Sequence, residues 1–206
     1  MNVGNSVRKA IEDWNHGELG SAMLHACNAV DGTAKKLYPT LGSNAGFTRL
    51  LRENYGIFGP MGVPGMNLKD TRFPVKVERP KAEGGKSDIA DVIYGIHRCN
   101  HGHGNALPEG FELIADKGGP AGYTRTQIEK GKIRLSDRVI SGLLAVAVLS
   151  PANIGQEVPE GYCLTYGKKR VILNINEWWG RASDFPAIVA QENVPIVTLE
   201  FGEWME

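Results

Sequence analysis

Apolar residues recur at three- and four-residue spacing through much of the N-terminal half, a pattern typical of amphipathic helices. It predicts helices over 3–14, 18–38 and 44–55, with Gly56 as the residue that ends the third helix. The next stretch, 57–85, is rich in glycine and proline. It is therefore predicted to be a long connection between helices.

A further helix is predicted to begin near Ser87, because serine is a favourable N-cap residue. Its apolar face is traced at helical spacing by Ile89, Val92, Ile93 and Ile96. The glycines at Gly102 and Gly104 indicate that this helix ends within or just after the segment 97–104.

The C-terminal half has the pattern of short strands separated by turns. Strands are predicted at 111–115, 123–128, 162–166, 170–173 and 195–201, and those at 162–166 and 170–173 form a hairpin. Helices are predicted at 137–149 and 185–191, and the first is apolar nearly all round, so it should be buried. Trp178 and Trp179 are adjacent, which on a strand would place one in the core and the other at an interface or under Arg181.

These elements predict an α+β fold that is mainly α, a helical bundle with a small C-terminal antiparallel sheet and one or two extra helices. Residues 1–107 form the helical region and residues 108–206 a small α+β extension. The length of 206 residues suits packing of both parts into one compact domain.

Composition narrows the functional classes. Lys and Arg total 23 and Asp and Glu total 23, so the net charge is zero and a protein that coats polyanions is not indicated. The three cysteines are far apart, which argues against a disulfide framework or a zinc ribbon. The longest apolar run, 143–149, is too short to span a bilayer. We therefore expect a cytoplasmic protein with no membrane association.

Three of the five histidines lie within seven residues, at His97, His101 and His103, with Arg98 among them. His97 and His101 are four apart, so on a helix they share a face and could bind zinc, copper or nickel. A third ligand would have to come from His25, Cys99 or a carboxylate. Because no third ligand is evident, we expect neither a bound metal nor another cofactor.

The same segment has the residue types needed to cleave RNA without a metal. Histidine can transfer protons near neutral pH, and the planar guanidinium of arginine can bind two phosphate oxygens. Gly102 could break the helix and let His103 turn back toward Arg98.

The run Arg98-Cys99-Asn100-His101-Gly102-His103, at the end of an amphipathic helix, resembles the motif of HEPN domains, in which a histidine follows an arginine after four to six residues. The earlier helix, AMLHACNAVDGTAKKLYP, is similar to a first core helix of that all-α superfamily, and the resemblance covers about residues 18–105. It implies a homodimeric endoribonuclease of toxin or defence type, with RNA as substrate at a dimer cleft. Arg98 would hold the scissile phosphate and His103 would transfer the proton, supported by Asn100, His101 and His97. The alternative is a catalytically silent HEPN-like module that binds a partner protein or a small ligand.

Other interpretations of these residues remain open. The histidines and Asn100 could simply cap the helix and satisfy carbonyls of the glycine-rich turn. Cys99 beside cationic groups could have a lowered pKa and act as a nucleophile. Asp31 and Lys35 are four apart and could pair across one helical turn.

Overall fold

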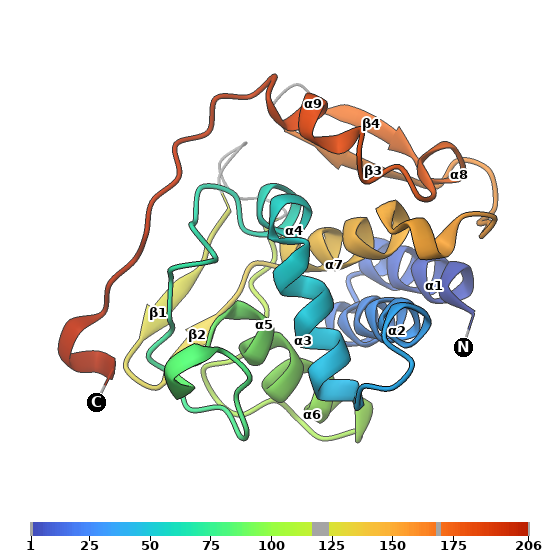
Figure 1. Ribbon diagram of the computed structural model, residues 1–206. Coiled ribbons are helices and arrows are strands. Elements are labelled where there is room, and N and C mark those ends of the chain that lie inside the picture. The colour runs from blue at the N-terminus through green and yellow to red at the C-terminus, as the bar shows by residue number, and fades with distance from the viewer. Residues whose placement is uncertain (1, 117–123, 168–169, 206) are drawn as a thin grey trace.

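The computed structural model describes residues 2–116, 124–167 and 170–205, which form a mainly helical molecule (Figure 1). The helices of the N-terminal half are α1 (Val3–His16), α2 (Leu19–Leu37), α3 (Ser43–Glu53), α4 (Tyr55–Gly62), α5 (Ile89–Val92), a π-helical segment (Ile93–Arg98) and α6 (Cys99–Gly102). The elements that follow are β1 (Gln127–Glu129), β2 (Lys132–Arg134), α7 (Arg138–Leu149), β3 (Cys163–Tyr166), β4 (Val171–Asn174), α8 (Ile175–Trp178) and α9 (Phe185–Val189).

Helix α7 lies at the centre of the fold. Every residue from Val139 to Leu149 is buried, and α1, α2, α4 and α8 pack around it. Two glycines allow α4 and α7 to approach closely, because a Cβ added to Gly142 would lie 3.0 Å from the Cα of Gly62. The core is one connected cluster that joins residues from both sides of position 108.

The strands form two separate two-stranded antiparallel sheets. In the first, Ile128 of β1 lies opposite Ile133 of β2, and in the second Leu164 of β3 lies opposite Leu173 of β4. The β3–β4 hairpin stands together with α8 and α9 at one end of the molecule, whereas β1 and β2 lie toward the other side (Figure 1).

The chain after α9 runs in extended form along the outside of the molecule (Figure 1). Val197 attaches it, because its N–H donates to the carbonyl of Gly65 at 2.9 Å and its own carbonyl accepts the N–H of Asn67 at 2.8 Å. Further along, the ring of Phe201 packs against that of Phe73, with the ring centroids 6.3 Å apart. The C-terminal segment therefore hydrogen-bonds to and packs against the irregular stretch that follows α4.

The predicted fold class is confirmed: the protein is mainly α-helical, with small antiparallel sheets in its C-terminal half. The helices predicted at 3–14, 18–38, 137–149 and 185–191 are present, as are the two strands of the hairpin. Arg181 lies over the ring of Trp178 at 4.5 Å and Trp179 is buried, as expected, although the pair ends a short helix rather than lying on a strand.

Several boundaries were predicted wrongly. Gly56 does not end a helix; it lies inside α4, which is apolar on nearly all sides and is stabilised by packing on α7. The strands predicted at 111–115 and 195–201 are each reduced to one bridge, Ile114 with Ser136 and Val197 with Met66. The strand predicted at 123–128 begins only at Gln127, and residue 123 lies outside the described residues. Among the helices described, none is long and apolar enough to cross a membrane.

Candidate functional site

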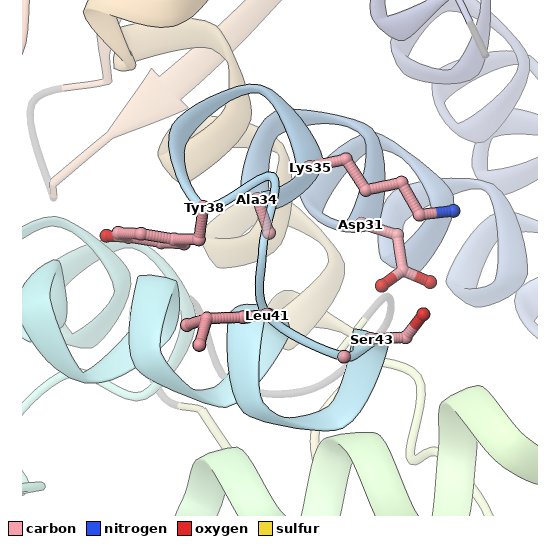
Figure 2. A pocket seen from close by; sticks show the side chains of 8 residues that line it. Asp31, Ala34, Lys35, Tyr38, Leu41 and Ser43 are labelled. Atoms are coloured by element: carbon pink, nitrogen blue, oxygen red, sulfur yellow. The ribbon is translucent and has the colours of Figure 1, made fainter.

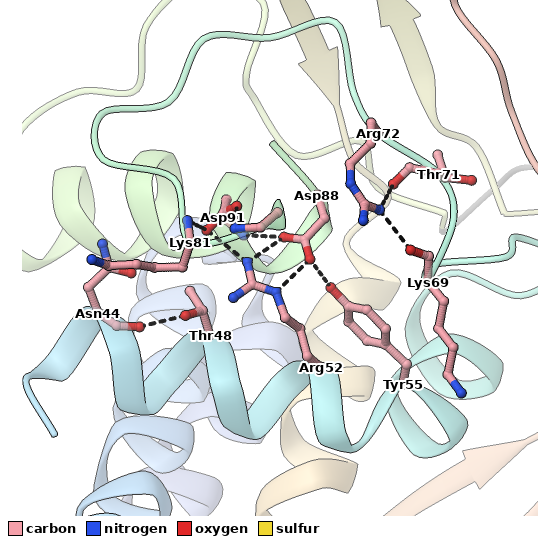
Figure 3. Close-up of polar contacts among 11 residues, drawn as sticks. Asn44, Thr48, Arg52, Tyr55, Lys69, Thr71, Arg72, Lys81, Asp88 and Asp91 are labelled. Atoms are coloured by element: carbon pink, nitrogen blue, oxygen red, sulfur yellow. Dashed lines mark hydrogen bonds and ion pairs between the residues drawn. The ribbon is translucent and has the colours of Figure 1, made fainter. Parts of the chain in front are cut away.

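The helix that contains the candidate site residues is anchored at its start by a buried ion-pair network (Figure 3). Its N-cap is Asp88 rather than the predicted Ser87, and Oδ1 of Asp88 accepts the N–H of Asp91 at 3.0 Å. Arg52 of α3 donates from Nε to Asp88 at 2.7 Å, and its Nη2 lies 2.9 Å from Asp91. These contacts fix the position at which the site helix leaves the preceding irregular stretch.

The middle of this helix is π-helical, from Ile93 to Arg98. The N–H of Cys99 donates to the carbonyls of Tyr94 and Ile96, and the side-chain amide of Asn100 donates to the carbonyl of Ile96 at 2.7 Å. Asn100 therefore satisfies a backbone carbonyl, as the capping interpretation suggested, although that carbonyl belongs to the helix and not to the glycine-rich turn. Such π-helical turns are rare and occur frequently at functional sites.

Arg98 is held in a fixed orientation by Asp31 of α2. Its Nε donates to Asp31 Oδ2 at 2.9 Å, and the guanidinium carbon lies 5.5 Å from the centre of the Tyr94 ring. The side chain of Asp31 is only 2% exposed and that of Arg98 is 25% exposed. Burial opposes the charged form of Arg98, but the carboxylate of Asp31 outweighs it and holds the pKa of Arg98 above its ordinary value.

The two terminal nitrogens of Arg98 remain available for a ligand. No hydrogen bond joins Nη1 or Nη2 to another group within the described parts of the chain. A Cβ added to Gly102 would lie 3.5 Å from Nη1, so the guanidinium lies close to the last turn of α6. The site thus combines a permanent cation, a fixed Nε and two free N–H₂ groups.

His103 is exposed and forms the C-cap of α6. Its backbone N–H donates to the carbonyls of Cys99 and Asn100, which fixes the chain direction just after Gly102. Within the described residues, no hydrogen bond or ring contact joins the imidazole of His103 to Arg98. The two candidate catalytic residues therefore lie at the same end of the helix, but the side chains are not in direct contact.

His97 and His101 are in a different environment from His103. The side chain of His97 is fully buried and neither ring nitrogen has a hydrogen-bond partner, while Nε2 of His101 is also buried and unpartnered. The two ring centroids are 6.1 Å apart. Burial, reinforced by the neighbouring His101, lowers the pKa of His97 to about 3, and burial also lowers the pKa of His101.

The third metal ligand that the sequence left open is not supplied. His25 lies on α2 with its Nε2 3.7 Å from Asp13. Over the residues that the structure describes, no group of three or more histidine, cysteine, aspartate or glutamate side chains is placed to bind a metal ion. His97 is buried, and His101 lies partly buried beside it.

The expectation of a reactive Cys99 is wrong. Burial raises the pKa of the Cys99 thiol, Arg98 lowers it, and Asp31 and Glu78 raise it further, so the net shift is upward. Because the thiolate is the nucleophile, this environment makes Cys99 less reactive than an ordinary cysteine.

Asp31 also lines a small hollow between α2 and α3, shown in Figure 2 together with Lys35 and Ser43. The hollow has about 10 Å³ of free space, roughly the room for one water molecule. It is too small for an organic ligand, and Arg98 does not line it.

Asp31 is the site residue whose role was predicted wrongly. It was expected to pair with Lys35, but its ion-pair partner among the described residues is Arg98, 67 positions along the chain. One signal was available in the sequence: Asp31 lies between Val30 and Ala34, on the apolar face of a helix. A carboxylate in that position requires a buried partner.

The fold and the site define a mainly helical protein with an oriented arginine at the end of a π-helical segment. The chain belongs to the Rv1289 family, whose model matches residues 2–205. It is 40% identical over 203 residues to "Uncharacterized protein Rv1289" of Mycobacterium tuberculosis and to "Uncharacterized protein Mb1320" of Mycobacterium bovis. Each match covers 98% of this chain and 95% of the relative. No solved structure gives a significant match.

This membership corrects the resemblance to HEPN domains. The Rv1289 family model accounts for nearly the whole chain, including the part that the short motif did not explain. An arginine followed five residues later by a histidine is a short pattern that unrelated helices also contain. The roles of Arg98 and His103 must therefore be argued from their own surroundings.

Proposed function

We propose that this protein binds a phosphate-bearing ligand at Arg98, acting as a binding module for RNA or for a small phosphorylated molecule. The observation that carries the proposal is the state of the Arg98 side chain: Asp31 fixes Nε, and among the described residues neither terminal nitrogen has a hydrogen-bond partner. A guanidinium prearranged in this way loses little conformational freedom when it binds two phosphate oxygens. The neutral charge of the whole chain favours recognition of one phosphate group over coating of a long polyanion.

Binding is tested by fluorescence anisotropy with a short labelled single-stranded RNA and, separately, by calorimetry with a nucleoside monophosphate. Arg98→Gln should weaken binding at least about tenfold, because a hydrogen bond to a charged group contributes about 1.5–3 kcal/mol. Arg181→Gln is a matched control, since Arg181 is also bound to a carboxylate, Asp184, and stacked on an aromatic ring. Equal affinity in wild type and Arg98→Gln, with both folded, would refute the proposal.

A second candidate is metal-independent cleavage of RNA, which the exposure of His103 at the same helix end favours. In that reaction the ribose 2′-hydroxyl attacks the adjacent phosphate and the P–O5′ bond breaks, while His103 transfers the proton to the leaving 5′-oxygen and Arg98 stabilises the developing charge. His103→Ala should slow cleavage by about 100- to 10,000-fold without changing RNA affinity. His16→Ala, which removes another exposed histidine, is the control. Cleavage should survive EDTA and give 2′,3′-cyclic phosphate ends, and DNA should stay intact.

We further propose that the protein works in the cytoplasm as a homodimer. The three free cysteines agree with a reducing compartment. The apolar helix α7 is covered within one chain, so it offers no surface for a dimer. The remaining support is exposed apolar surface, with Ile154 71%, Ile172 62% and Ile196 70% exposed. Light scattering that gives a monomer mass at high protein concentration would contradict this assembly.

A further inference from the structure

The buried pair His97 and His101 has no role in the binding just described, yet it is costly to the folded protein. Three ring nitrogens of the pair are buried without partners. Unpartnered buried polar groups are uncommon and call for an explanation. His97 lies on the π-helical segment directly before Arg98, and His101 lies one turn later on α6, so the protonation state of the pair can affect the position of the Arg98 guanidinium.

The side chain of His97 is fully buried, so a charged imidazole there would lack water while the segment is closed. The ring of His101 packs against α2, where a Cβ added to Gly20 would lie 3.3 Å from its Cε1. On the other side of the segment, a Cβ on Gly95 would lie 2.3 Å from Cγ1 of Val77. Protonation within this packing would place a positive charge in an apolar site, so a proton is accepted only when the segment opens.

Among the described residues, no carboxylate is paired with either imidazole, and Glu78 of the preceding irregular stretch affects the pKa of Cys99 but not that of His97. The helices α2, α3, α5 and α6 contact the π-helical segment, and their charged groups are engaged in pairs of their own, Asp31 with Arg98, Arg52 with Asp88 and Asp91, and Arg49 with Glu53. Among the other ionisable groups on these helices, which are His25, Cys27, Lys35, Lys36, Cys99 and His101, and Tyr94 of the segment itself, only His101 affects the pKa of His97. His101 lowers the pKa of His97, and burial lowers the pKa of both histidines, so neither imidazole readily takes up a proton while the segment is closed.

The π-helical turn supplies the moving part. In this turn the N–H of Cys99 donates to the carbonyl of Tyr94, five residues earlier, and also to the carbonyl of Ile96, three residues earlier. Conversion of this turn to an α-helical turn, or its local unwinding, changes the register of the following residues by about one position, a rotation of about 100°. Arg98 would then leave Asp31, because their single hydrogen bond depends on that register.

We propose that His97, His101 and the π-helical segment form a proton-operated hinge, in which proton uptake opens residues 93–103 and withdraws Arg98 from Asp31, weakening ligand binding at acid pH. The binding part of this proposal rests on the proposed function. The opening itself does not, so the two can be tested separately.

Hydrogen exchange measured by mass spectrometry on the full chain without ligand tests the opening. After correction for intrinsic rates, protection of 93–103 should fall about tenfold for each pH unit below the ordinary histidine pKa of about 6.5. Protection of α7 should stay constant over the same range, which separates local opening from global unfolding. His97→Leu should remove most of the pH dependence, whereas His16→Gln, a change at an exposed histidine, should leave it intact.

Three results would overturn the hinge: protection of 93–103 that does not vary with pH, equal loss of protection in α7, or unchanged pH dependence in His97→Leu. If His97→Leu does not fold, the NMR titration of His97 in wild type decides instead. A closed-state ring that titrates near pH 6.5 contradicts the proposal, and one that stays neutral down to pH values where the segment opens supports it.

The effect on binding is measured with a short RNA probe at about pH 7.5 and about pH 5.5. A phosphodiester keeps its charge over this range, unlike a phosphate monoester with its second pKa near 6. Affinity should fall at the lower pH in wild type and change little in His97→Leu. If the segment opens but the probe never binds, the proposed function fails and the hinge stands. If the probe binds equally at both pH values while the segment opens, the regulatory role is refuted.

Discussion

Replacing Arg52 by methionine should destabilise the protein strongly, because Arg52 neutralises two buried carboxylates at the start of the site helix (Figure 3). The side chains of Asp88 and Asp91 are 4% and 1% exposed. Methionine keeps the length of the apolar stem but removes the charge and the donors. The perturbation therefore isolates the ion-pair network from the packing of the α3 helix.

The loss of unfolding free energy depends on the hydrogen-bond donors that Asp88 and Asp91 keep in Arg52→Met. Asp88 keeps the hydroxyl of Tyr55 at 2.8 Å, and Asp91 keeps the N–H groups of Lys81 and Ala82 at 2.8 and 3.0 Å. Removing one partner of a buried ion pair costs about 3–5 kcal/mol, and these surviving donors place the loss near the lower end, about 3 kcal/mol. For a chain of this length, that corresponds to a fall in Tm of about 6–12 °C.

Arg49→Met is the matched control on the same helix. Arg49 pairs with Glu53 four residues away, and both side chains are about half exposed, so its loss should cost much less than the loss of Arg52. Urea denaturation of both variants beside wild type gives the two free energies. A difference below about 0.5 kcal/mol between Arg52→Met and Arg49→Met would refute the assignment of the network as a buried anchor.

The network also predicts a pH dependence with a definite sign. Burial raises the pKa of Asp88, but Arg52, the N–H of Asp91 and Tyr55 outweigh it, so the folded pKa lies below its ordinary value. A depressed folded pKa stabilises the protein above the unfolded pKa, and this contribution is lost as pH falls through the folded pKa. The stability difference between wild type and Arg52→Met should therefore shrink below about pH 4.

Further changes test the packing of the helices and the absence of a metal. Gly142→Ala should cost about 1–3 kcal/mol of unfolding free energy, because its Cβ would lie 2.8 Å from Phe58, whereas Gly56→Ala, with open space around it, should be neutral or stabilising by up to about 1 kcal/mol. Asn100→Ala should lower stability by about 1 kcal/mol through loss of the bond to the Ile96 carbonyl, and hydrogen exchange near Cys99 should increase. Elemental analysis of untagged protein should find no stoichiometric zinc, copper or nickel, and about one ion per chain would reverse our interpretation of His97 and His101.

Sequence periodicity was sufficient for the long helices, because their apolar faces recur over several turns. The helix predicted at 137–149 illustrates this, since its apolar residues on all sides match a helix that is covered on all sides. Periodicity did not predict α4, because Gly56 and Pro60 are residues typical of a connection between helices. Close packing between Gly62 of α4 and Gly142 of α7 stabilises a helix there, and no local pattern contains that contact.

The candidate site shows the same limit at the level of single residues. The cluster of Arg98 with three histidines was visible in the sequence, but helical spacing alone gave Asp31 to Lys35, one turn away. The buried carboxylate of Asp31 instead pairs with Arg98 from another helix. A buried carboxylate needs a partner that is itself partly buried, and Arg98 meets that condition. The wide π-helical turn lies between α5 and α6, and no periodic pattern in the sequence indicates such a turn. Arg98 is the last residue of that segment, so the orientation from which we argue its function could not be read from the sequence.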